Sequence, residues 1–186
     1  MKKLWTDLHS NIHHNQMDEL DKWTEHAKDV LDFWPIAYYP FQMIKTESGA
    51  GLEDLCPEEE IKKDWEIVRR KVKEENANGY PMFMGYEWQG CGFDGDHNVF
   101  FLDNEQDMKH PMRYQELRDD YKDTEAIGIP HHVAYQLGSR GKNWATHDEN
   151  FSPFAEIYSS HGCSENDTGG MDMERHLHMG PRTGET

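Results

Sequence analysis

The feature that most constrains the fold of this chain is the alternation of amphipathic helical segments with short apolar runs. The clearest helix is predicted over residues 57–78, because a proline and three glutamates open it and Asn78-Gly79 suits its end. Its apolar face has residues spaced by 4, 3 and 4 positions: Ile61, Trp65, Val68 and Val72. A second apolar run, residues 80–88, follows at once and reads as a strand.

The remaining elements continue this alternation. Further helices are expected at about residues 17–31 and 112–121. Strands are expected at residues 3–8, 32–40, 80–88, 97–103, 126–130 and 154–158, and a loop at residues 46–55. Such alternation is typical of an α/β fold with a mostly parallel sheet, either open or closed into a barrel.

Composition narrows the class of protein. A chain of 186 residues fits a single domain, and a net charge of −17 argues against nucleic acid as a partner because phosphate is repelled. No apolar run approaches the roughly 20 residues that span a bilayer, and no signal-peptide core follows the first residues. The three cysteines form no disulfide framework, so a reducing cytoplasm is the expected location. The 12 histidines raise the expectation of bound metal.

A polar stretch at residues 6–16 carries Asp7, His9, His13 and His14 directly after a short apolar run. A strand that ends in such a loop is a common way to present metal ligands. Taken alone, the stretch fits solvated polar loop histidines better than metal ligands, because such short patterns are common. The metal interpretation gains weight only from what the later strand ends carry.

Polar residues of the same kind follow other predicted strands. Glu87 closes one strand, His131 and His132 close another, and His161 follows a third, whereas His97 opens a strand. The carboxyl ends of parallel strands gather at one face of an α/β fold, where sites are built. Several imidazoles with a carboxylate suit zinc, manganese or iron. Such ions activate a bound water for hydrolysis near neutral pH.

Five segments together resemble the PHP (polymerase and histidinol phosphatase) superfamily, in particular a branch of unknown function, over roughly residues 5–165. The segments are Asp7-Leu8-His9, Gly85-Tyr86-Glu87-Trp88, His97-Asn98-Val99, Pro130-His131-His132 and residues 156–162. The resemblance implies a distorted seven-stranded β/α barrel of the TIM-like kind, a site for two or three divalent metals, and phosphoester hydrolysis of a small-molecule substrate. It implies metal ligands at His9, Glu87, His97 and His131, and it places His161 where this branch has a His-Gly pair.

Three departures from the family pattern bear on this expectation. Asn11 stands where a second histidine of His-x-His is expected, and His13 or His14 could substitute for it. Tyr38-Tyr39 stands where the family has Asp-His, and the closing Asp-x-His is absent, so we expect a C-terminally incomplete barrel.

The full set of expected metal ligands is His9, His13, His14, Glu87, His97, His131 and His132, with Asp7 and His161 as catalytic candidates. The first functional hypothesis is a metal-dependent hydrolase. The alternatives are a degenerate, non-catalytic ligand-binding domain, motivated by Tyr38-Tyr39, and a different chemistry on the same scaffold.

Overall fold

The computed structural model describes residues 2–45, 51–90, 92–133, 135, 140–159 and 162–164 of the chain. These residues form a mixed α/β structure that divides into two compact units. The first unit comprises Met1–Glu87 and Phe100–Met108, and the second comprises Trp88–Val99 and the described part of Lys109–Thr186. None of the helices in the described ranges is long and apolar enough to cross a membrane.

The first unit contains a parallel group of strands. β1 (Asn11–His13) pairs with β3 (Ala37–Tyr39), and β3 pairs with β6 (Met82–Trp88) through the partners Tyr38 and Tyr86. The short β2 (Trp34–Pro35) also pairs with β6 in parallel. The predicted strand at residues 32–40 is therefore present as two pieces, β2 and β3. The strand predicted at residues 3–8 is wrong, because the first strand begins only at Asn11.

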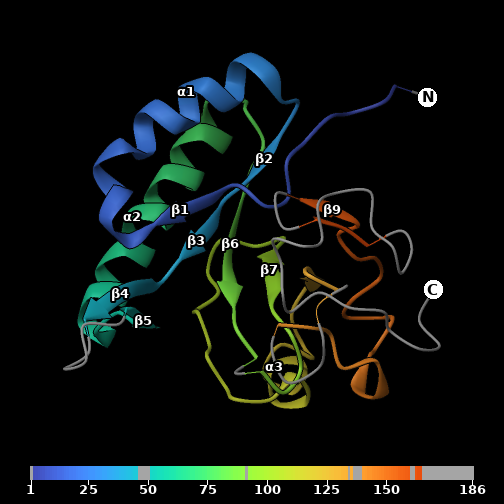
Figure 1. Cartoon of the computed structure of the whole chain (residues 1–186). Coiled ribbons are helices and arrows are strands. Elements are labelled where there is room, and N and C mark those ends of the chain that lie inside the picture. The colour runs from blue at the N-terminus through green and yellow to red at the C-terminus, as the bar shows by residue number, and fades with distance from the viewer. Residues whose placement is uncertain are drawn as a thin grey trace. The chain divides into compact units, whose positions relative to one another are not determined.

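Two helices cover this group of strands. α1 (Leu20–Val30) follows the 3₁₀ turn η1 (His14–Glu19), and α2 (Glu58–Ala77) matches the helix predicted over residues 57–78. The two helices lie side by side (Figure 1). Lys71 of α2 forms an ion pair with Asp21 of α1 at 2.5 Å, and Lys28 of α1 forms one with Glu75 of α2 at 2.6 Å.

The buried face of α2 carries the apolar residues expected from its periodicity. Trp65 packs edge-on against Tyr86 of β6, with ring centroids 6.0 Å apart. A hairpin of β4 (Phe41–Lys45) and β5 (Gly51–Leu55) precedes the helix, so residues 51–55 form a strand within the region expected to be a loop.

The second unit contains smaller elements. They are α3 (Tyr114–Asp120), β8 (Ala126–Pro130), the 3₁₀ turn η2 (Trp144–Thr146), β9 (Tyr158–Ser159) and β10 (Gly162–Cys163). β7 (His97–Phe101) begins in this unit. The helix expected at residues 112–121 and the strand expected at residues 126–130 are both confirmed. The strand expected at residues 154–158 is reduced to a two-residue pair that begins at Tyr158.

The expected seven-stranded β/α barrel is wrong. Hydrogen-bonded neighbours in the main sheet follow the order β1-β3-β6-β7-β8, and within the described residues β1 and β8 do not pair to close it. A barrel requires every strand to be paired on both sides with a consistent tilt and stagger. The described part of the chain supplies three α-helices and several strands of only two or three residues, too little for repeated strand–helix units to complete a ring.

Candidate metal site

The second unit brings three potential metal ligands together: Asp96, His131 and His132. One ligand atom from each lies within 4.8 Å of the others. Asp96 directly precedes β7, and the two histidines directly follow β8. The backbone N–H of His131 donates to the carbonyl oxygen of Asp96 at 3.1 Å, which holds the two segments together. The group is therefore built from two strand ends rather than from one flexible loop.

All three ligand candidates are buried, with exposed fractions of 4% for Asp96, 0% for His131 and 6% for His132. Burial of a carboxylate is unfavourable unless it is paired or binds a cation. The guanidinium Nε of Arg140 lies 3.9 Å from Asp96 Oδ2 and supplies one positive charge. Two imidazole nitrogens and one carboxylate oxygen form a donor set that suits zinc or ferrous iron with open coordination positions. The residues present thus fit a divalent transition metal.

The backbone of His132 supports a functional interpretation. His132 has a φ of 56°, a left-handed conformation that is uncommon outside glycine. Its ring meets the ring of His131 edge-on, with centroids 4.5 Å apart, and the centroid of the Tyr135 ring lies 5.5 Å away. Strain of this kind persists where the surroundings enforce it, and it is concentrated at functional sites. Here it turns two consecutive imidazoles toward one carboxylate.

A buried carboxylate, Asp94, organises the loops around this group. It accepts hydrogen bonds from the Arg113 guanidinium at 2.8 Å, the Tyr114 backbone at 3.0 Å and the Asn143 amide at 3.0 Å. These contacts hold the pKa of Asp94 below its ordinary value against the opposing effect of burial. Asp94 therefore fixes the segment that carries Asp96 two residues further on.

His97 does not belong to either group of potential metal ligands found among the described residues. Its Nδ1 lies 3.2 Å from the Gly95 carbonyl, and its Nε2 lies 3.0 Å from the ammonium nitrogen of Lys142. Burial lowers the pKa of the His97 imidazole well below its ordinary value, and the charge of Lys142 lowers it further. Both ring nitrogens are thus engaged inside the protein, and the ligand role implied by the resemblance stays a prediction.

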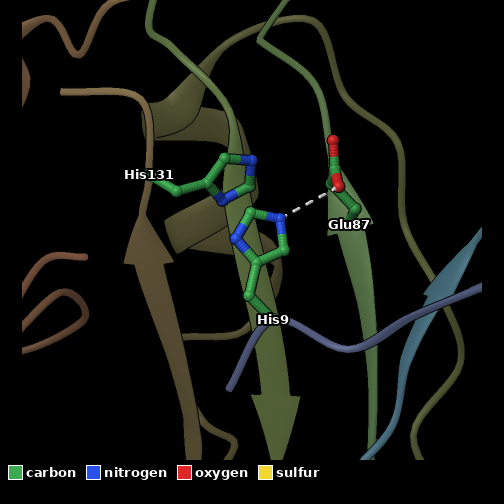
Figure 2. A group of neighbouring side chains, drawn as sticks. All are labelled: His9, Glu87 and His131. Carbon is green, nitrogen blue, oxygen red and sulfur yellow. Dashed lines mark ion pairs between the residues drawn. The ribbon is translucent and has the colours of Figure 1, made fainter. Parts of the chain in front are cut away.

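In the first unit, His9 and Glu87 form a second histidine–carboxylate pair. Nε2 of His9 lies 3.7 Å from Oε2 of Glu87 at the end of β6 (Figure 2). The Asn11 amide donates to the same oxygen at 2.7 Å, while Asn11 Oδ1 has no hydrogen-bond partner among the described residues. Asn11 therefore contacts the carboxylate from the position where the family pattern places a histidine. The third side chain in Figure 2, His131, belongs to the second unit described above.

The other predicted residues lie elsewhere. Asp7 is exposed, and its carboxylate accepts the backbone N–H of His9 at 2.8 Å, so it shapes the turn that carries His9. The ring of His13 packs on Tyr39, and His14 contacts two carboxylates of α2. His161 lies outside the described residues.

Two important residues of the second unit were missed from sequence. Asp96 and Lys142 carry no periodic signal, but Asp96 stands in a glycine-rich loop in which Gly92 and Gly95 both have positive φ. A Cβ on Gly95 would lie 2.8 Å from the Lys142 backbone, so this glycine permits a close approach of two loops. The run Gly92-Phe93-Asp94-Gly95-Asp96 was the available clue to a specifically folded loop.

Comparisons with protein-family models, with curated proteins and with solved structures found no match for this chain.

Proposed function

We propose that this protein is a metal-dependent hydrolase of a small phosphoester, with the metal held by Asp96, His131 and His132. The observation that carries the proposal is the convergence of these three buried ligands from two strand ends, with His132 in a strained backbone conformation. The resemblance to the PHP superfamily supports the same reaction class. The cytoplasm is the proposed location.

A divalent metal bound by these residues would polarise a phosphoryl oxygen and lower the pKa of water. The protein's own contribution is to fix the ligands: the Asp96 carbonyl holds the His131 backbone, and the Asp94 network holds the preceding loop. Arg140 would supply a positive charge for an anionic substrate, because its side chain is 36% exposed and its guanidinium lies beside Asp96. Arginine recognises phosphate through paired N–H donors.

The alternative of a non-catalytic ligand-binding domain rested on Tyr38-Tyr39 as the wall of a ligand pocket, and the positions of these residues do not favour it. Tyr38 and Tyr39 are buried, with exposed fractions of 0% and 7%. Their hydroxyls donate to Asp64 and Glu53, respectively. Both tyrosines therefore pack in the interior and donate to carboxylates, and they do not form an accessible wall for a sugar or organic ligand.

The proposal is tested by assaying phosphomonoester and phosphodiester hydrolysis with added zinc, manganese or ferrous iron. We expect metal-dependent turnover that falls at least 100-fold in Asp96→Asn and His131→Ala. The matched controls are Asp123→Asn and His26→Ala, which change exposed residues of the same types. Turnover that is absent with every metal, or unchanged in the two ligand variants, would overturn the proposal.

A further inference from the structure

A histidine in the first unit is held between two carboxylates of α2. Nδ1 of His14 lies 2.6 Å from Asp64 Oδ2, and Nε2 of the same ring lies 3.2 Å from Glu60 Oε2. The buried hydroxyl of Tyr38 donates to the same Asp64 oxygen at 2.8 Å. Asp64 has a side chain that is only 8% exposed, whereas the Glu60 side chain is 51% exposed. The ring thus has a buried side, toward Asp64, and an open side, toward Glu60.

The buried side has the arrangement that orients metal-binding histidines. Such histidines almost always donate their second ring N–H to a carboxylate, which fixes the ring and raises its basicity. Asp64 accepts from the His14 ring in this way and is itself held by Tyr38. Burial, followed by the neighbouring Asp64, raises the pKa of Tyr38 far above its ordinary value, so the hydroxyl keeps its proton and remains a donor.

The open side has the spacing of two ligands on one ion. Zinc binds histidine nitrogen and carboxylate oxygen at about 2.0–2.2 Å, so two such atoms on a tetrahedral ion lie about 3.3 Å apart. The separation between His14 Nε2 and Glu60 Oε2 is 3.2 Å. Without a cation, the same two atoms form an ion pair across this distance. A cation would take the place of the Nε2 proton, which leaves to solvent.

The surrounding charge favours a cation. The pKa of the Cys56 thiol is raised to about 11, first by burial and then by Glu60 and Asp64, which shows that the negative potential of both carboxylates reaches this thiol. Glu60 also belongs to a first helical turn that carries Glu58 and Glu59. Carboxylates beside an imidazole supply the oxygen and nitrogen donors that zinc accepts.

We propose that His14 and Glu60 bind a divalent transition-metal ion such as Zn²⁺, with Asp64 and Tyr38 orienting the imidazole and water completing the coordination. This site is built within the first unit and uses none of the ligands of the hydrolase proposed above. The alternative is that the side chain of His14 only links η1 to α2 through its contacts with Glu60 and Asp64. A bridge of that kind has no preference for metal.

The test is a Zn²⁺ titration of the metal-free chain, followed by calorimetry and by the ring-nitrogen NMR signals of the histidines. The His14 signals are assigned as those missing from His14→Gln. We expect Zn²⁺ to shift the Nε2 signal of His14. We also expect Glu60→Gln to weaken binding at this site at least tenfold and Tyr38→Phe to weaken it up to tenfold.

The matched control is Glu58→Gln, the same substitution in the same helical turn, where the carboxylate is exposed and pairs with Lys62. Glu58→Gln should bind Zn²⁺ as the wild type does. His14 signals that do not shift at saturating Zn²⁺, or equal Zn²⁺ binding by Glu60→Gln and Glu58→Gln, would overturn the proposal. Asp96→Asn separates the two proposals, because it should remove hydrolysis while leaving the Zn²⁺-dependent shift of His14 intact.

Discussion

Lys142 should make the stability of this protein depend on pH in a specific way. Its side chain is buried, with an exposed fraction of 1%, and its ammonium nitrogen lies 3.5 Å above the ring of Tyr114. The ring face and the nearby Asp94 favour the charged form, but the loss of hydration outweighs them. Burial therefore lowers the pKa of Lys142 from 10.5 to about 7.

The sign of the effect follows from which state binds the proton. Between pH 7 and 10.5 the unfolded chain keeps the lysine protonated while the folded chain does not, so rising pH favours the folded state. Below pH 7 both states are protonated, and the full cost of burying the charge is present. A shift of about 3.5 pKa units corresponds to about 5 kcal/mol, at about 1.4 kcal/mol per unit.

The assay is urea unfolding of the wild type and Lys142→Met at pH values from 6 to 10. Methionine fills similar space without a charge. We expect the wild type to gain up to about 1.4 kcal/mol of unfolding free energy per pH unit relative to the variant between pH 7 and 10, with no relative change below pH 7. Lys122→Met, at an exposed position, should show no such difference. Parallel pH profiles for the wild type and Lys142→Met would refute the reasoning.

Further predictions concern the loops around the candidate metal site. Asp94→Asn should lower the unfolding free energy by about 1 to 3 kcal/mol in urea melts, because a buried acceptor for three donors loses its charge; equal stability of Asp94→Asn and Asp123→Asn would contradict this. His132→Val should be less stable than His132→Asn by about 1 to 2 kcal/mol in thermal melts, since valine tolerates a φ of 56° poorly; the reverse order would show that the backbone there is not left-handed. Gly95→Ala should cost about 1 to 3 kcal/mol, because the new methyl group meets the Lys142 backbone, and a fully stable variant would exclude that close approach.

The elements of the fold were predictable where one local pattern dominated. The 4, 3, 4 spacing of Ile61, Trp65, Val68 and Val72 predicted α2, because a 3.6-residue period places those side chains on one face. Trp65, Val68 and Val72 on that face are buried, and Ile61 is partly exposed. β8 was equally clear from its apolar run between turn residues. Closure of the sheet was not predictable in this way. Pairing between distant strands leaves no periodic signal, and the barrel was inferred from resemblance alone.

The candidate metal site was likewise predictable only where a local sequence pattern indicated it. The pair His131-His132 at the end of β8 was predicted correctly as a strand-end feature, and the structure adds the left-handed backbone that turns the second ring. Asp96 was missed because it precedes β7, whereas ligands were expected mainly at residues that follow strands. The role of His14 as a metal ligand stays a prediction, and the fold adds that α2 presents Glu60 and Asp64 to its ring.

The central claim, that Asp96, His131 and His132 bind metal, is tested most directly by elemental analysis. The untagged chain is purified without chelators and loaded with zinc, manganese or ferrous iron before gel filtration. We predict that Asp96→Asn and His131→Ala each retain one metal equivalent fewer than the wild type, while His26→Ala retains the full amount. Equal metal content in the wild type and both ligand variants would contradict the account.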